Sequence, residues 1–195
     1  MTTTMRIEDQ TRQLILDRVT QIHIDARVPD FTIGHPVAPY LRRWFIVRRG
    51  ARWLDMPLAE RMHILEADNP REDDNQPNTY LHRFLRSDDD RALHDHPWPW
   101  ATLILDGTYI EHLPADPSDP AGPTRAFARH AGEIVIRRDA SRPHRVELID
   151  GQPVTTLFFT GGKCREWGFW CKQGWRHWRE FTAPGDGDQI DRGCE

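Results

Sequence analysis

Cysteine and long apolar runs are both scarce in this chain of 195 residues. Its three cysteines, Cys164, Cys171 and Cys194, form neither an even set nor a CxxC pair, so we expect no disulfide framework and no thiolate zinc site. This cysteine usage favours a reducing cytoplasm. No segment approaches the roughly 18 apolar residues of a membrane span, and the N-terminus MTTTMRIEDQ has no signal-peptide pattern. We therefore expect neither export nor membrane insertion.

Lysine is nearly absent, because Lys163 and Lys172 are the only two in the sequence. The remaining basic residues are arginines, and the formal net charge is −4. That balance gives no strong attraction to nucleic acid or membrane, so we expect neither as a partner. The length is typical of one well-buried core with extensions.

The first 78 residues mix helical and strand patterns. Helical spacing of apolar residues predicts an amphipathic helix over 7–24, and aromatic and β-branched residues predict a strand over 38–49. Helical spacing returns over 57–67, and the Asp, Asn and Pro content of 68–78 indicates an exposed loop. We expect these N-terminal elements to pack on a separate barrel.

From Thr79 the pattern becomes one of short strands broken by Gly, Pro and Asp, which favours an antiparallel sandwich or barrel. The predicted strand segments are 79–86, 100–113, 124–130, 132–138, 143–149, 153–159 and 165–170. We assign 79–182 to this barrel. The tail 183–195 has little to bury and is predicted to be disordered.

The sequence HDHP at 94–97 brings two imidazoles together. Residues i and i+2 of a strand share a face, so His94 and His96 project side by side while Asp95 turns away. In the later segment RPHRVEL, His144 alternates with Val146 and Leu148, which predicts that His144 points inward. Three imidazoles then suit a metal ion better than isolated core histidines do.

These residues resemble the motifs of the cupin superfamily. His94, His96 and Gly107 follow the first cupin motif, although Trp100 stands where that motif has glutamate. Gly132 and His144 follow the second motif at about one residue more than its usual spacing. The run YLHRFLRSDDDRALHDHPW is also similar to small cupin-like proteins of bacterial and phage genomes. The resemblance implies an all-β jelly-roll barrel, here with an N-terminal helix and a helical insertion, and a homodimer.

A set of three histidines without the glutamate is similar to the metal sites of cysteine dioxygenase and related cupins. That resemblance implies His94, His96 and His144 as ligands of Fe(II), with Zn, Mn or Ni as other candidate metals, and O₂ with a small anionic molecule as substrates. It also implies an arginine for the substrate, and Arg83 and Arg86 are the candidates, although both also suit a solvated face. Trp100 and Tyr109 are further candidate substrate-binding residues.

A fourth ligand is available from His82, Glu111 or His112. His82 is the first choice, because it shares a strand face with Tyr80 and Phe84 and is expected to point inward. The acidic run 88–90 favours a turn over a second metal site. The tryptophan-rich segment 167–178 suits packing, a barrel cover, a pocket wall or a subunit contact.

Three classes of function fit the pattern. The first is a mononuclear non-haem iron dioxygenase or related oxygenase, the second a metal-dependent isomerase or epimerase of a sugar-like substrate, and the third a small-molecule-binding barrel without catalysis. In the isomerase, Glu111 or His112 is the candidate base.

Overall fold

The structure is a computed structural model that describes residues 2–35, 37–48, 77–88, 92–182 and 193–194. The helix expected at 57–67 and nearly all of the loop expected at 68–78 lie outside these ranges. Among the described residues, no helix is both long and apolar enough to cross a membrane.

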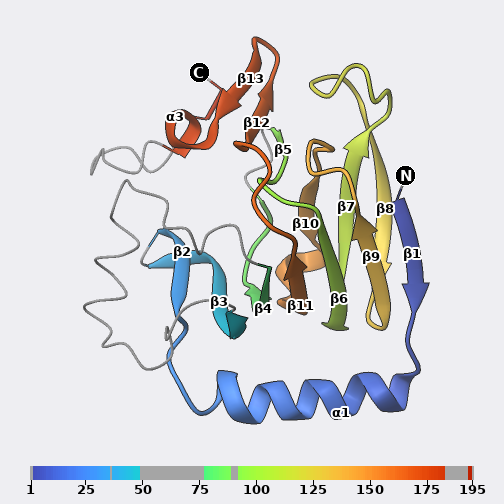
Figure 1. Ribbon diagram of the computed structural model, residues 1–195, viewed down its shortest axis with the longest axis vertical. Helices are drawn as coiled ribbons and strands as arrows, with labels where there is room; N and C mark the ends of the chain where they lie inside the picture. The colour runs from blue at the N-terminus through green and yellow to red at the C-terminus, as the bar shows by residue number, and fades with distance from the viewer. Residues whose placement is uncertain (1, 36, 49–76, 89–91, 183–192, 195) are drawn as a thin grey trace.

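Strands dominate the chain (Figure 1). The first half contains β1 (Thr2–Arg6), α1 (Asp9–Val19), a π-helical turn η1 (Thr20–Ile24), β2 (Phe31–His35), β3 (Ala38–Arg48) and β4 (Asn78–Phe84). The second half contains β5 (Leu93–His94), β6 (Trp100–Asp106), β7 (Thr108–Pro114), β8 (Thr124–His130), β9 (Glu133–Arg137), β10 (Arg145–Leu148), the turn η4 (Ile149–Gly151), β11 (Val154–Thr160), β12 (Gly168–Cys171), β13 (Gly174–His177) and α3 (Trp178–Thr182).

The strands form antiparallel sheets in two facing layers. One layer is seven-stranded, in the order β1-β9-β6-β11-β4-β3-β2. The other contains β10-β7-β8 and β13-β12-β5, which an antiparallel bridge between His94 and His144 connects. The two histidines exchange backbone N–H···O hydrogen bonds of 2.9 Å each. The second layer therefore continues across the bridge that carries two of the predicted ligands.

Helix α1 lies along the bottom of the view in Figure 1 and covers one face of the seven-stranded sheet. Its Ile15, Leu16 and Val19 pack against buried residues such as Leu81 and Leu103. The guanidinium of Arg12 also donates a 2.6 Å hydrogen bond to the carbonyl oxygen of Leu105. Apolar burial on this outer face thus fixes the helix across the strands.

The opposite face of the same strands points into the sandwich. One interior cluster contains Phe45, Tyr80, Trp100, Val135 and Phe158. A second contains Ile104, Tyr109, Val146, Leu148 and Val154. Strict alternation separates these residues from those beneath α1, because successive strand side chains point to opposite faces.

The all-β antiparallel fold with an N-terminal helix is confirmed. Strands β1, β2 and β13 were not predicted, and β1 pairs with β9 at the edge of the seven-stranded sheet. Strand β2 pairs with β3 and β3 pairs with β4, so all three N-terminal strands extend the barrel sheet itself. The domain limits at 78 and 182 stay a prediction.

The expectation of no disulfide framework did not foresee the one disulfide that the structure contains. Cys171 and Cys194 are bonded, with their Cα atoms 5.4 Å apart. Cys194 also packs beside Cys171 and Phe181, whereas residues 183–192 and 195 lie outside the described ranges, so the disorder expected of the tail stays a prediction. The bond depends on α3 and the β12–β13 hairpin turning the chain back, which cysteine spacing does not encode. The cytoplasmic location stays a prediction, and this disulfide does not support it.

Candidate metal centre

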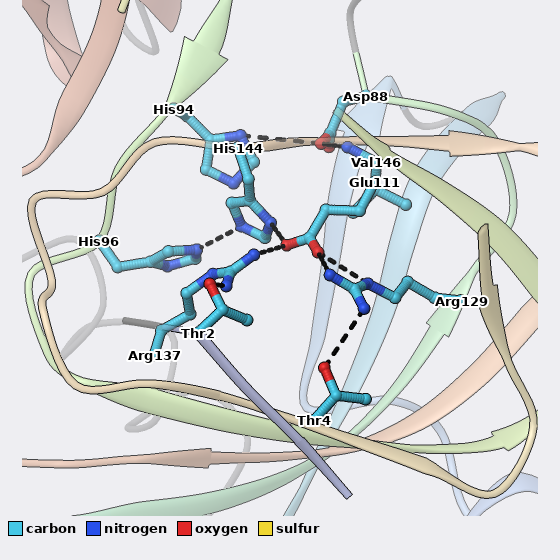
Figure 2. A network of polar contacts seen from close by, with 10 residues as sticks. All are labelled: Thr2, Thr4, Asp88, His94, His96, Glu111, Arg129, Arg137, His144 and Val146. Atoms are coloured by element: carbon cyan, nitrogen blue, oxygen red, sulfur yellow. Dashed lines mark hydrogen bonds and ion pairs between the residues drawn. The ribbon is translucent and has the colours of Figure 1, made fainter. Parts of the chain in front are cut away.

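The side chains of His94, His96 and His144 converge in the interior. One ring nitrogen from each lies within 4.8 Å of those of the other two. The Nε2 atoms of His96 and His144 are 2.9 Å apart, and Figure 2 shows the three rings turned toward one another. Three imidazole nitrogens at this spacing fit a divalent metal ion. No carboxylate joins this group in the part of the chain that the structure describes.

Backbone pairing positions the three rings. His94 ends β5 and is held against His144 by the two-way bridge. The backbone N–H of His96 donates to the carbonyl oxygen of Ala140 at 3.1 Å, so the second histidine is fixed to the loop that leads to the third. The inward orientation predicted for His144 is confirmed, because its side chain is buried along with those of Val146 and Leu148.

Burial favours the neutral form of two of the three rings, those of His94 and His96. Burial lowers the pKa of His94 to about 4. The nearby carboxylate of Asp88 raises this pKa, and the neighbouring His144 lowers it by a smaller amount. Burial also holds the pKa of His96 well below its usual value of 6.5. A neutral imidazole keeps a lone pair for a metal, so these rings are in the ligand-competent form at neutral pH.

Asp95 does turn away from the histidines, but into a second buried site. Its carboxylate accepts hydrogen bonds from the backbone N–H of Gly168 at 2.8 Å and from the indoles of Trp170 and Trp175 at 3.3 and 3.1 Å. It also forms a 2.8 Å ion pair with Arg165. Asp95 thus anchors the tryptophan-rich hairpin beside the histidines, a role that sequence spacing does not reveal.

The same contacts show how the tryptophan-rich segment is used. Trp167 and Phe169 lie against the ring of His94, with ring centroids 6.4 and 5.8 Å from it. Trp167 also stacks on Trp178. The segment packs within this chain and walls one side of the cluster.

Two carboxylates lie next to Nδ1 atoms of the histidine rings. Glu111 is fully buried and its Oε1 lies 3.1 Å from Nδ1 of His144. Asp88 lies 3.7 Å from Nδ1 of His94 and accepts a 2.6 Å hydrogen bond from the backbone N–H of Val146. Burial alone would raise the pKa of Glu111, but the hydrogen bond from His144 and the nearby cations lower it to about 2. Both acids therefore face ring nitrogens that point away from the cluster centre.

The other candidate ligands lie elsewhere. His82 points inward as expected, and it stacks on Phe158 at a ring distance of 4.9 Å, outside the group of three. His112 lies on the other face of β7 from Glu111, where its Nε2 is 2.6 Å from the carboxylate of Glu147. Of the acidic run, only Asp88 is among the described residues, and its backbone N–H donates a 2.8 Å hydrogen bond to the carbonyl oxygen of Val146 on β10, so the turn expected at 88–90 stays a prediction.

The candidate substrate-binding residues divide in the same way. The ring of Trp100 lies 5.3 Å from that of His96 and 4.9 Å from that of His144, so it lines the cluster. Tyr109 is buried deeper, among the apolar residues of the second interior cluster. Arg83 faces the groove between α1 and the sheet, and Arg86 is exposed after β4. Neither arginine reaches the interior, because Arg83 alternates with the inward His82 and Arg86 follows the strand.

Other arginines in the described part of the chain do face the interior, among them Arg43 and Arg137. Arg43 lies over the ring of Tyr80 at 4.8 Å and pairs in register with His82. Its positive charge helps to lower the pKa values of His82 and His96. Arg137 is 2% exposed and lies over the ring of Trp100 at 5.7 Å. The alternation of Leu41, Arg43 and Phe45 along β3 carries the signal for Arg43, and Phe45 packs in the interior.

Comparisons with known proteins give partial likenesses of fold. No protein-family model matches the sequence, and no curated protein matches it. A prolyl-4-hydroxylase from Pseudomonas putida is similar over 84% of this chain and 93% of its own, at 14% identity and a TM-score of 0.49. A mutant Bacillus subtilis oxalate decarboxylase is similar over 49% of this chain, at 20% identity and a TM-score of 0.36. This chain spans only 24% of that protein.

A structure of a DMSP lyase is similar over 47% of this chain and 42% of its own, at 15% identity and a TM-score of 0.35. Likenesses of this extent carry no information about the reaction. The antiparallel sandwich and the histidine cluster fit the cupin resemblance by themselves, and the case for a metal depends on the geometry of the three rings.

Proposed function

We propose that this protein is a mononuclear non-haem Fe(II) oxygenase that acts on a small anionic molecule. The observation that carries the proposal is the convergence of three buried imidazoles without a carboxylate among the described residues. His94, His96 and His144 would hold the ion through imidazole nitrogen atoms. A ligand set of this kind leaves an Fe(II) ion its full charge and open positions, and so suits redox chemistry with O₂ and an anionic substrate.

The absence of a carboxylate ligand from the described residues has a structural reason. Trp100 occupies the place at which the cupin motif has glutamate, and its ring packs against His96 and His144. The buried carboxylate of Glu111 on β7 is hydrogen-bonded to two arginines and to the Nδ1 atom of His144. The aromatic ring of Trp100 also excludes water from one side of the cluster.

The preference for an anion comes from Arg43. Its Nε atom is buried and has no hydrogen-bond partner among the described residues. Both ring nitrogens of the neighbouring His82 are likewise buried and unpartnered there. A buried guanidinium N–H without a hydrogen-bond partner is costly, so a carboxylate or similar group of the substrate would satisfy it.

The isomerase alternative is less well supported, because both of its candidate bases are engaged in other contacts. Glu111 is hydrogen-bonded on both oxygens, and His112 lies on the opposite face of β7 beside Glu147. Neither group is free to accept a proton from a substrate beside the histidines. The oxygenase needs no such base and is the better supported function.

Metal analysis of untagged protein purified without oxygen tests the proposal. We expect about one iron per chain in the wild type and almost none in His96→Ala, followed by O₂ uptake when the iron-loaded protein is screened against small carboxylates and thiols. Arg43→Met should keep the iron and weaken the response to anionic substrates, whereas Arg83→Met on the outer face should behave as the wild type. Stoichiometric zinc that resists exchange, with no O₂ uptake after iron loading, would overturn the proposal.

A further inference from the structure

Glu111 is the centre of a buried ionic network that joins the two sheets behind the histidines (Figure 2). Its Oε1 accepts a 2.6 Å hydrogen bond from Arg137 on β9, and its Oε2 accepts a 2.9 Å bond from Arg129 on β8. Glu111 itself lies on β7 of the second layer, whereas β9 belongs to the seven-stranded sheet. The network therefore spans the interior of the sandwich.

The third partner of Glu111 is the predicted metal ligand His144. Nδ1 of this ring lies 3.1 Å from Oε1, and on the other side of the ring Nε2 lies 2.9 Å from Nε2 of His96. A carboxylate acceptor places the proton on Nδ1 and leaves the lone pair on Nε2. Glu111 thus sets both the tautomer and the direction of the ring.

The N-terminal strand β1 contacts both arginines of the network. Thr2 on β1 pairs in register with Arg137, and its hydroxyl oxygen accepts a hydrogen bond from the guanidinium of that residue. The hydroxyl oxygen of Thr4 lies 3.4 Å from Nη1 of Arg129. Each arginine of the network is thereby held between Glu111 and a threonine of β1.

We propose that Glu111 is the positioning residue of the histidine cluster, and that strand β1, acting through Arg137 and Arg129, makes metal affinity depend on the docking of residues 2–6. The inference rests on the proposed function, because it assumes that the cluster binds a metal. It adds that the first strand of the chain, far from the cluster in sequence, is part of what holds His144 in its metal-binding orientation.

The opposing explanation is that the network stabilises the fold alone. Removing one partner of a buried ion pair destabilises a protein whatever else the pair does. A purely structural network would change the melting temperature without changing the metal site of the molecules that stay folded. Metal affinity and the spectrum of the bound metal separate the two explanations.

Glu111→Gln is the first variant, because glutamine keeps the shape and a carbonyl acceptor but removes the charge. Glu147→Gln is the matched control: Glu147 lies on the neighbouring strand β10 and contacts a histidine nitrogen at 2.6 Å, outside the cluster. We would titrate Co²⁺ into chelator-treated protein at neutral pH and follow the visible absorption of the bound ion. Loss of a carboxylate that orients a ligating histidine costs about 10- to 100-fold in metal affinity.

We expect that loss in Glu111→Gln, with an altered Co²⁺ absorption spectrum, and neither change in Glu147→Gln. Thr2→Val keeps the strand propensity of β1 and should weaken Co²⁺ binding in the same direction but less. If the wild type and His96→Ala bind Co²⁺ equally weakly, the proposed function fails. If the wild type binds Co²⁺ in a His96-dependent manner and Glu111→Gln binds it equally well with an unchanged spectrum, this inference fails. Should Glu111→Gln not fold, Thr2→Val decides: unchanged affinity and spectrum would overturn the role of β1.

Discussion

Burial disfavours the charged form of three imidazoles that face the interior, those of His82, His94 and His96. Burial lowers the pKa of His82 and of His96 well below 6.5, and that of His94 to about 4. His82 differs from the others, since its two ring nitrogens have no hydrogen-bond partner among the described residues. A buried polar group without a partner costs about 1–3 kcal/mol. Such a residue weakens the fold and is best explained by a ligand.

His82→Phe should therefore stabilise the metal-free protein by about 1–2 kcal/mol, because it removes two desolvated nitrogens from an aromatic environment formed by Tyr80, Phe84 and Phe158. The gain should grow as the pH falls from 7 to 5. A folded-state pKa below the unfolded one makes the unfolded state bind more protons, so wild-type stability is lost as the pH falls through 6.5. Urea unfolding at several pH values in the presence of chelator measures both effects.

Replacement of the exposed His130 by Gln is the control for the histidine experiment. It should leave both the stability at neutral pH and its change with pH close to the wild type. A His82→Phe variant that is less stable than the wild type at every pH would contradict the argument. It would mean that His82 has a partner that the described residues do not reveal.

At this scale, alternation along strands predicts direction but not partnership. The inward faces of His144 and His82 followed from Val146, Leu148, Tyr80 and Phe84, and the same rule applied to β3 would have found Arg43. The partners of Glu111 could not be predicted, because Arg129 and Arg137 come from strands whose register is set by the whole sandwich. The alternation that turns His82 inward also places Arg83 on the outer face of β4, so the role expected for Arg83 conflicted with the direction expected for His82.

At the scale of elements, the hairpin β12–β13 is held to β5 by one buried carboxylate. Asp95 is fully buried and receives three hydrogen bonds in addition to the ion pair with Arg165. Strand pairing between β12 and β5 involves only Phe169 with His94 and Trp170 with Leu93. Because this strand pairing is so short, we infer that the Asp95 carboxylate provides much of the interaction that holds the hairpin to β5.

Asp95→Asn should destabilise the protein by about 2–3 kcal/mol, because an amide directs N–H groups at donors and leaves Arg165 without its anion. The partial exposure of Arg165 keeps the loss below that of a fully buried pair. Tryptophan fluorescence should also shift, since the indoles of Trp170 and Trp175 lose their acceptor. Asp116→Asn, in an exposed turn, should change the stability by less than about 0.5 kcal/mol. Equal stability of the two variants would show that Asp95 does not hold the hairpin.

The disulfide between Cys171 and Cys194 attaches the last residue of β12 to the C-terminal segment. The loop it closes spans 23 residues, so its removal should lower the stability by about 3 kcal/mol if constraint of the unfolded chain dominates. Cys194→Ser in oxidising buffer tests this value by urea unfolding. Cys164→Ser is the control, since that exposed cysteine is free. A thiol assay that finds three free cysteines in unreduced wild-type protein would contradict the bond.

Strands β2 and β13 were missed, but most strands after residue 37 were predictable to within a few residues because their apolar alternation is local. Strand β1 was not, since TTTMR has no apolar alternation and is a strand only because β9 offers an edge to pair with. The disulfide escaped prediction because it depends on where α3 and the hairpin lead the chain. Local patterns therefore specified the elements, and the site required their arrangement.

At the scale of the whole molecule, the cluster ties together segments that are distant in sequence. His94 and His96 come from β5 and the turn after it, and His144 comes from the residue before β10, which is bridged to β5. A metal held by all three would cross-link these segments only in the folded state. Binding and folding are then linked, because an ion that binds the folded state alone stabilises it by mass action.

We expect a divalent metal at about 100 times its dissociation constant to stabilise the protein by about 2.7 kcal/mol. For a chain of this size, this corresponds to a rise in melting temperature of about 5–10 °C. His144→Ala should abolish the rise, whereas His112→Ala, which removes a histidine from the outer side of the adjacent strand, should keep it. Differential scanning fluorimetry with Co²⁺ or Zn²⁺, before and after chelator, measures all three proteins. An equal rise in His144→Ala and the wild type would place the bound metal elsewhere on the molecule and remove the physical basis of the proposed centre.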